Sequence, residues 1–236
     1  MINLLATLIL IHFGSIDFDE IAKRINQVDT YTELIALIND DLGYNGLESI
    51  IDRELGNNTQ QTRLKFTTQE YGKYYHLSLV KKEDKLLYCV LSNYKKQHEI
   101  VFDESGIIEY LDYFNSIFKT SKSLQDFKLE IDCIVLFSDG CGFSGEPTKD
   151  WIKMEKFVQN KKVKGIRNYL NSLDVESQIY GIIGMYKLRK KGVKLSAKDQ
   201  QTIDYLIERN SKVYTCMGCL IGEVFDTKDL VKYYEH

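Results

Sequence analysis

The sequence predicts an α+β protein: N-terminal helices and an antiparallel β-meander sheet, followed by an all-α C-terminal helical layer. Up to about residue 55, apolar side chains recur at helical spacing, and over residues 64–102 they alternate with polar ones. Beyond residue 140 the helical spacing returns and continues to the end of the chain. We therefore divide the chain into residues 1–15, an α+β part at 16–140 and a helical part at 141–236.

Three amphipathic helices are expected first, because apolar residues recur every three or four positions. The three apolar stripes are Phe18, Ile21, Ile25 and Val28; Leu34, Ile35, Ile38 and Leu42; and Leu47, Ile50, Ile51 and Leu55. The segment Gly56-Asn57-Asn58 then predicts a turn that ends this block.

A run of short strands follows. Leu64 and Phe66 alternate with polar neighbours, and the next segment places Tyr75, Leu77 and Leu79 on one face. Residues 86–91 are apolar on both faces, which indicates a central strand, and His98, Ile100 and Phe102 suit a short strand after it. Short connections between consecutive strands predict an antiparallel meander.

One helix and one strand complete this part. A helical stripe is formed by Ile107, Leu111, Phe114 and Phe118. Alternation then runs through Phe127, Leu129, Ile131, Cys133, Val135 and Phe137, and predicts a strand inside the sheet.

Only helices are expected after the glycine-rich loop at 138–145. Pro147, Asp174 and Ser196 suit helix starts, and Gly181 and Gly184 inside a helix suggest close contact with a neighbouring helix. A fifth helix is predicted from Val213, Met217, Leu220 and Val224, before a final turn or two at 226–234.

This C-terminal stretch resembles HEAT-type or armadillo-type helical hairpins. The resemblance covers about 80 residues and depends on the succession of short helices, the capped junction at 173–178 and a basic helix end closed by Gly192. It implies a scaffold that presents a surface to a protein partner, although no second copy recurs at a fixed period.

The N-terminus bears on the compartment. Ile2 to Ile11 is an apolar run as long as a signal-peptide core, and a small pair, Gly14-Ser15, follows it. The run is too short to span a bilayer, so we expect no transmembrane segment. No Lys or Arg precedes it, and a buried N-terminal segment of a cytoplasmic protein is the alternative. We favour export to an extracytoplasmic (periplasmic or secreted) location.

Charge is distributed unevenly along the chain. The formal net charge is −3, yet residues 149–198 hold 13 Lys and Arg against four Asp and Glu. A nucleic-acid-binding protein that uses this segment is therefore one alternative function. The basic face would be formed by Lys161, Lys162, Lys164, Arg167, Arg189, Lys190 and Lys191.

The loop from Gly140 to Gly145 matches the G-x-G-x-x-G pattern of dinucleotide-binding loops. That pattern requires a parallel strand after the following helix, which we do not expect here. Glu146 also places a negative charge where a phosphate would bind. An enzyme with a site at this loop remains the second alternative, and a tight link between sheet and helices is the simpler interpretation.

The five cysteines are Cys89, Cys133, Cys141, Cys216 and Cys219. In an exported protein we expect a disulfide from Cys141 to Cys216 or Cys219, whereas in a cytoplasmic protein these residues would be small buried side chains. A zinc site would combine Cys216 and Cys219 with Cys141 and Cys133, although Cys133 points into the core face of its predicted strand.

The sequence offers no acid–base pair, activated nucleophile or closed set of metal ligands. We therefore expect a non-enzymatic binding or scaffold protein with an unidentified protein partner and no cofactor or metal.

Overall fold

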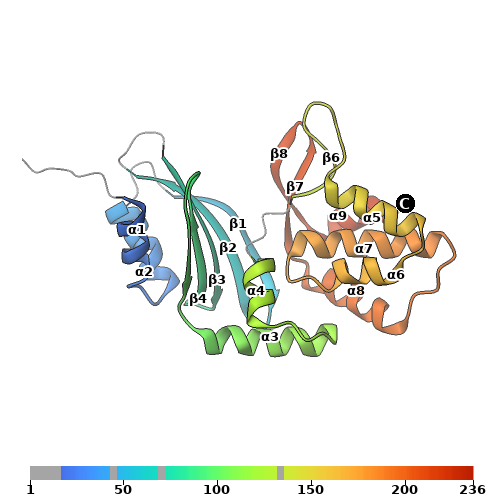
Figure 1. Cartoon of the computed structure of the whole chain (residues 1–236), viewed down its shortest axis with the longest axis horizontal. Coiled ribbons are helices and arrows are strands. Elements are labelled where there is room, and N and C mark those ends of the chain that lie inside the picture. Colours follow the sequence, from blue (N-terminus) through green and yellow to red (C-terminus); the bar gives the residue numbers. More distant parts are fainter. Residues whose placement is uncertain (1–16, 43–46, 69–72, 132–135, 236) are drawn as a thin grey trace, which may run out of the picture.

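The computed structural model describes residues 17–42, 47–68, 73–131 and 136–235. It confirms the α+β class: a five-stranded antiparallel sheet carries helices on both faces, and a helical layer with a second, three-stranded sheet lies beside it (Figure 1). The apolar run Ile2–Ile11 and the pair Gly14-Ser15 lie outside the described residues.

The first two predicted helices are confirmed. They are α1 (Phe18–Ile25) and α2 (Tyr31–Ala36), the second of which continues as the π-helix Leu37–Leu42. Asp17 caps α1 by accepting the Glu20 amide, and Thr30 forms a reciprocal capping box with Glu33. Together these helices cover one face of the large sheet.

The third predicted helix is wrong, because residues 47–56 form strand β1 (Leu47–Gly56). Ile51 and Leu55 are spaced for one helix face, yet with Arg53 between them they also share one face of a strand, and all three are buried. The turn decides between the two structures. Asn57 and Asn58 both have positive φ, 55° and 57°, as a two-residue β-hairpin loop requires.

The predicted meander is confirmed, with strand order β1-β2-β3-β4-β5. Its further strands are β2 (Thr59–Thr67), β3 (Tyr74–Lys82), β4 (Lys85–Ser92) and β5 (Gln97–Val101). Residues 86–91 of β4 are buried on both faces, as expected of an inner strand.

Helix α3 (Glu104–Phe118) is confirmed, but the predicted strand at 127–137 is wrong over its described first part. Residues 124–131 form helix α4 (Leu124–Ile131), and strand β6 begins only at Phe137 (Phe137–Cys141). Ser123 and Asp126 exchange hydrogen bonds at the start of α4 and fix it as a helix. Phe127 and Ile131 then reach the core from one helix face; Cys133 and Val135 lie outside the described residues.

Four predicted C-terminal helices and the short final one are confirmed. They are α5 (Lys149–Gln159), α6 (Val163–Leu170), α7 (Val175–Lys190), α8 (Ala197–Arg209) and α9 (Thr227–Glu235). The glycine in α7 does mark close contact, because a Cβ on Gly181 would lie 2.4 Å from the Leu170 backbone nitrogen of α6.

The fifth predicted helix is wrong, and the C-terminal part is therefore not all-α. Residues 212–226 form a hairpin of β7 (Lys212–Gly218) and β8 (Leu220–Asp226). Gly218 opens its two-residue turn with φ 59°, a position where such turns favour glycine. Val213, Met217 and Val224 fit a helical stripe by spacing, and the turn overrides that spacing.

Strand β7 runs parallel to β6 and antiparallel to β8. This overturns the expectation that no strand follows residue 140, because helices α5–α8 form the connection between two parallel strands. Among residues 17–42, 47–68, 73–131 and 136–235, none of the helices combines the length and the apolar character that crossing a membrane requires.

Candidate functional site

The two sheets are joined by a buried cluster of charged and polar side chains. Arg53 of β1 donates from one terminal nitrogen to Glu176 of α7, and from Nε and its other terminal nitrogen to Gln61 of β2 at 2.8 and 2.6 Å. Glu176 also accepts the Tyr214 amide of β7 at 2.9 Å. Because the side chains of Arg53 and Glu176 are almost fully buried, this ion pair depends on its partners for solvation.

Asp174 and Glu176 share this site, and their pKa values shift in opposite directions. Burial, and then the adjacent Glu176 carboxylate, raise the pKa of Asp174 well above its ordinary value. Burial opposes ionisation of Glu176 as well, but Arg53 and Arg63 outweigh it and lower the pKa of that carboxyl. The pKa values of the two buried carboxyl groups therefore shift in opposite directions, and the arginines stabilise the ionised form of Glu176.

Arg209 at the end of α8 extends the connection. Its guanidinium donates to the Gln178 side chain at 2.6 Å and to the Leu55 carbonyl of β1 at 3.3 Å. Ser211 donates to the Glu54 carbonyl. These contacts hold β1 against the helical layer, so the separation of the two sheets is fixed by side chains rather than by the chain alone.

One face of the large sheet is covered only in part. Tyr88 packs edge-on against Phe127 of α4, with ring centroids 5.4 Å apart, and α3 and α4 cover this half of the face. In the other half the strand register places two rows of mainly polar residues side by side. One row consists of Arg63 and Ser78. The other runs across four strands and consists of Lys65, His76, Ser92 and Gln97.

This polar half faces the β7–β8 hairpin across a groove. A hollow of about 270 Å³ is lined by Ile50, Arg63, Leu64, His76, Leu77, Ser78, Ser92, Gln97 and Tyr214. A second, of about 520 Å³, is lined by Glu48, Ser49, Ile50, Lys65, Tyr74, His76, Tyr214, Ile221 and Gly222. The two hollows share Ile50, His76 and Tyr214, so we treat them as one space, named here the inter-sheet groove. Figure 1 shows the hairpin opposite the large sheet at this place.

Tyr214 occupies the centre of the groove because of a glycine. Gly222 has φ 91° at the irregularity in β8, and a Cβ there would lie 3.0 Å from the Tyr214 hydroxyl. Any side chain at position 222 would therefore both strain the backbone and displace the ring. The bulge thus positions an aromatic hydroxyl over the polar half of the large sheet.

The groove lining holds two positive side chains, Arg63 and Lys65, and one negative side chain, Glu48. Lys65 forms an ion pair with Glu48 at 3.4 Å and lies over the Tyr74 ring, 4.6 Å from its centroid. Burial, and then the positive charge of Lys65, lower the pKa of His76, so its imidazole is neutral at pH 7. The groove therefore offers hydrogen-bonding groups and aromatic surface rather than a strong field.

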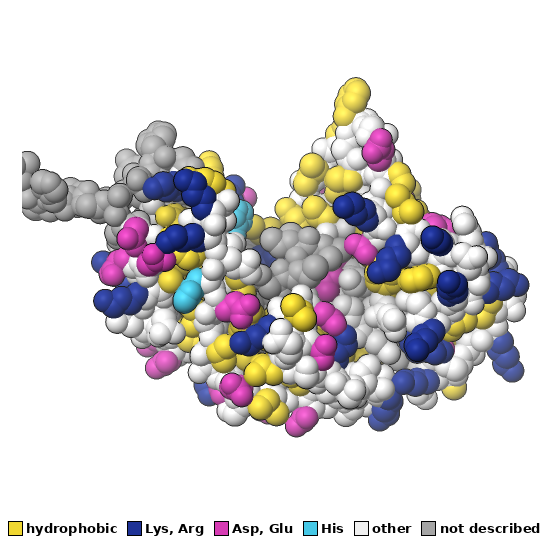
Figure 2. All heavy atoms as spheres, in the orientation of Figure 1, with side chains coloured by type: hydrophobic (Ala, Val, Ile, Leu, Met, Phe, Trp, Pro, Cys, Tyr) yellow, Lys and Arg dark blue, Asp and Glu magenta, His cyan; other side chains and the backbone are white. Residues whose placement is uncertain are grey.

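An exposed apolar projection stands next to the groove. Phe143 in the β6–α5 loop is fully exposed, and Leu220 and Ile221 of β8 are 58% and 64% exposed. We call these three residues the apolar crest. Figure 2 shows hydrophobic atoms at the tip and along the flanks of this projection. A disulfide between Cys141 and Cys216 ties the loop to the hairpin beneath the crest.

The disulfide agrees with one of the two pairings that the sequence left open. Cys141 and Cys216 have Cα atoms 5.3 Å apart, whereas Cys219 is free and exposed in the hairpin turn, and Cys216 lies in a strand rather than in a helix. Cys89 is buried in β4. No three His, Cys, Asp or Glu side chains within the described ranges are grouped to hold a metal ion.

The glycine-rich loop is closed by its own backbone. The Cys141 amide donates to the Glu146 carbonyl at 2.9 Å, and the Gly142 amide donates to the Gly218 carbonyl at 2.7 Å. A Cβ on Gly140 would lie 2.8 Å from the Gly145 carbonyl oxygen. Although β7 provides the parallel strand that the dinucleotide-binding pattern requires, these amides serve the junction with the hairpin, and a phosphate would have to displace them.

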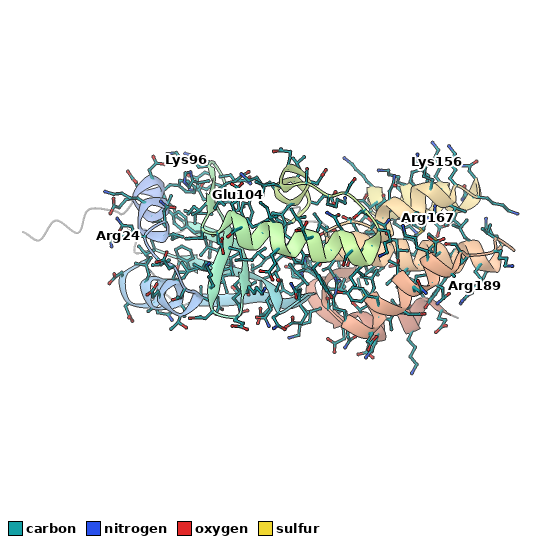
Figure 3. All side chains as sticks on the ribbon, turned by 90° about the horizontal axis from the view of Figure 1, so that it is seen from below. Arg24, Lys96, Glu104, Lys156, Arg167 and Arg189 are labelled. Atoms are coloured by element: carbon teal, nitrogen blue, oxygen red, sulfur yellow. A yellow bond between two sulfur atoms is a disulfide. The ribbon has the colours of Figure 1, made fainter. Side chains whose placement is uncertain are left out.

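Six of the seven predicted basic residues lie near one another, at one end of the helical layer. Lys161, Lys162 and Lys164 lie at the α5–α6 junction, and Arg189, Lys190 and Lys191 close α7. Helices α5, α6 and α7 pack together, and Figure 2 shows Lys and Arg side chains gathered over this end. Figure 3 shows Lys156 and Arg189 at the same end.

Arg167 is the exception among the seven. It is engaged in a bidentate pair with Asp199 at 2.7 and 2.8 Å. Its guanidinium therefore joins α6 to α8 instead of contributing to a free basic face.

Nothing in the sequence predicted that Arg53, Glu176, His76 and Tyr214 would lie together in one site. The one signal in the sequence was the run of polar residues in inner strands, such as Arg63 and Ser78, where a sheet covered by helices on both faces would be apolar. Comparison with models of known protein families, with curated proteins and with solved structures finds no match to this chain.

Proposed function

We propose that this is a non-enzymatic binding protein whose inter-sheet groove holds an extended segment of a partner polypeptide alongside β8. The observation that carries the proposal is the groove itself, in which the polar half of the large sheet meets the β7–β8 hairpin. Its lining combines aromatic surface at Tyr74 and Tyr214 with hydrogen-bonding groups at His76 and Ser92, a mixture typical of binding sites.

The edge of β8 supports a polypeptide as the occupant. Within the described residues β8 pairs only with β7, so its other edge offers backbone donors and acceptors. Leu220, Ile221 and Val224 are exposed along it. An extended chain added to such an edge gains main-chain hydrogen bonds, and pockets for alternate side chains supply specificity.

Charge favours a different chain over a second copy of this one. Glu223 is the central residue of β8. Antiparallel pairing of two β8 strands about their centres would place Glu223 opposite Glu223, and like charges directly opposite destabilise a sheet. Because Asp226 adds a second negative charge, we propose a partner segment that is apolar and carries a basic residue.

The disulfide supports an extracytoplasmic location for this binding. Disulfides persist in oxidising compartments and are rare in cytosolic proteins. Cys141–Cys216 also fixes the loop that carries Phe143 before any partner arrives, which reduces the ordering cost of association. We propose that the apolar crest forms the rim of the same binding surface.

The test uses random 12-residue peptides displayed on phage and selected against the intact oxidised protein. Enriched peptides are synthesised, and their dissociation constants are measured by fluorescence anisotropy. The Ile221→Asp variant should weaken binding at least about tenfold, which is the effect of losing about 1.4 kcal/mol of contact free energy. Ile152→Asp is the matched control, because Ile152 is a similarly exposed apolar residue on α5.

Hydrogen exchange locates the peptide independently of the variants. Bound peptide should slow amide exchange within 220–226 and leave that of α6 unchanged. Selected peptides that bind Ile221→Asp as tightly as the wild type, or that protect α6 instead of β8, would overturn the proposal. A small molecule as the true occupant would yield no groove-dependent peptide.

A nucleic-acid partner is the second candidate, favoured by the basic residues gathered at the ends of α5, α6 and α7. Part of that cluster has a local cause, since positive side chains stabilise the C-terminal ends of helices. Binding to a duplex should weaken with salt and be lost in Lys161→Glu/Lys162→Glu/Lys164→Glu. Binding that is absent at low salt removes this candidate.

A further inference from the structure

Three cysteines lie in the two segments that join where the β6–α5 loop reaches the β7–β8 hairpin. Cys141 lies in the parallel ladder directly opposite Gly218, and Cys219 is the next residue along the chain from that glycine. Cys216 lies in β7, two residues before Gly218, and is bonded to Cys141. Adjacent strands are about 4.8 Å apart and consecutive Cα atoms about 3.8 Å apart, so the Cα atoms of Cys141 and Cys219 are at most about 9 Å apart. A disulfide between them would require the hairpin turn to move closer to the loop.

The three sulfur-bearing residues differ in access. Cys216 is fully buried, Cys141 is half-buried and Cys219 is exposed. Attack on a disulfide requires that a thiolate approach one of its sulfurs from outside. Cys141 Sγ is therefore the accessible target, and Cys219 is the cysteine placed to reach it.

We infer that Cys141, Cys216 and Cys219 form a thiol–disulfide exchange site with two interchangeable linkages. The Cys219 thiolate attacks Cys141 Sγ, the Cys141–Cys219 bond forms and the Cys141–Cys216 bond breaks. Cys216 leaves as a thiolate and takes up a proton equivalent to the one that Cys219 released. The number of disulfides is unchanged, so no external oxidant or reductant is needed.

The backbone around the sulfurs suits such an exchange. The Gly142 amide donates a hydrogen bond to the Gly218 carbonyl and keeps the loop attached to the hairpin. Cys141 is therefore not released when its disulfide partner changes. Gly218 lies between Cys216 and Cys219 and has a positive φ. As a glycine it can adopt other backbone conformations, which the exchange would require. The exchange would convert an exposed thiol at Cys219 into a buried one at Cys216 without detaching the apolar crest.

The first experiment asks whether the second linkage can form. The Cys216→Ser variant is purified, reduced and then reoxidised with oxidised glutathione. We expect it to lose about 2 Da, the mass of two hydrogen atoms, as Cys141–Cys219 forms. Cys141→Ser/Cys216→Ser, which lacks the attacked sulfur, is the control that should gain no such bond. Circular dichroism establishes that each variant is folded.

The second experiment follows the wild-type protein, so that it does not depend on a variant folding. The oxidised protein is held at a series of pH values and its free thiols are trapped with N-ethylmaleimide. Cyanogen bromide cleavage after Met217 separates Cys216 from Cys219, and mass spectrometry locates the label. We expect label on both residues, with exchange that accelerates as pH rises because the thiolate is the attacking species. In the Cys219→Ser variant, label at Cys216 should be lost, whereas Cys89→Ser should leave it unchanged.

Label confined to Cys219 at every pH would overturn the inference. A folded Cys216→Ser variant that keeps Cys141 and Cys219 as free thiols would overturn it as well. Label at Cys216 that persists in Cys219→Ser would show reduction by some other route, and this too would exclude the exchange.

Discussion

At the scale of single residues, we expect substitution of Glu176 to cause a large loss of stability. Its fully buried carboxylate neutralises Arg53 and accepts the Tyr214 amide. We predict that Glu176→Gln lowers the free energy of unfolding by about 3–5 kcal/mol, because it removes the buried carboxylate that pairs with Arg53. Guanidinium unfolding measures this. Glu155→Gln, which breaks the partly exposed pair with Lys187, should cost at most about 1 kcal/mol. Equal effects would contradict the assignment.

Asp174 should tolerate a change that Glu176 does not. In Asp174→Asn the amide oxygen still caps α7 at the Ser177 amide, and the amide nitrogen replaces the carboxyl proton toward Glu176. We predict a cost of no more than about 1 kcal/mol at acidic pH.

The pH dependence of the same variant has a definite sign. Because the folded-state pKa of Asp174 is raised, its stabilising contribution is present at low pH and is lost as pH rises through that value. The thermal midpoint of the wild type should therefore fall over this range, and Asp174→Asn should lack that fall. A parallel pH profile for the two proteins would exclude a proton at Asp174.

His76 reports on the electrostatics of the groove. Burial is the larger cause of its lowered pKa and Lys65 the second. Lys65→Gln should therefore raise the pKa of His76, measured by NMR titration, without restoring its ordinary value. Lys95→Gln, an exposed lysine beside Tyr94, is the control and should leave it unchanged. A lowered pKa that does not respond to Lys65→Gln would mean that burial alone sets it.

At the scale of elements, the contact of α6 with α7 depends on Gly181. A Cβ there would meet the Leu170 backbone at 2.4 and 2.5 Å, and backbone cannot move aside. We predict that Gly181→Ala destabilises the protein by about 1–3 kcal/mol, despite the higher helix propensity of alanine. Gly184→Ala is the comparison, since its nearest neighbours are side-chain atoms of Ile166, and it should cost less in urea unfolding. The reverse order would show that the helices part easily.

The same scale explains which elements sequence could and could not predict. Long helices such as α3 and α8 have both apolar periodicity and caps, and they were predicted. Segments 47–56 and 212–226 have apolar spacings that suit a helix and a strand equally. In both cases the deciding information was a two-residue turn. Asn57 and Asn58 form the first turn and Gly218 opens the second, and the preference of these residues for positive φ outweighs the helical spacing. In α4 the Ser123–Asp126 cap was the overlooked signal.

At the scale of the whole molecule, the disulfide closes a long loop. Cys141 and Cys216 are 75 positions apart and enclose all four helices of the crossover. We predict that Cys141→Ser lowers the free energy of unfolding by about 4 kcal/mol, mainly by freeing the unfolded chain. Cys219→Ser should change it little. Guanidinium unfolding with and without reductant makes the comparison, and an oxidised wild type no more stable than the reduced one would contradict the prediction.

The candidate site could not be predicted from the sequence, because its residues come from distant parts of the chain. Arg53 and Glu176 are 123 positions apart, and Tyr214 comes from a segment expected to be helical. Local periodicity carries no information about which polar residues of separate elements meet. The disulfide could be predicted to within two pairings, because the chain has only five cysteines and each can pair only with another.

The buried Arg53–Glu176 pair also limits how the molecule can respond to a ligand. It joins the first strand of one sheet to the helix that supports the other, at the base of the space between them. Spreading the sheets would pull opposite charges apart where water does not reach. The buried pair therefore opposes any increase in the distance between the two sheets. Binding that requires the two sheets to separate would therefore have to break this buried ion pair.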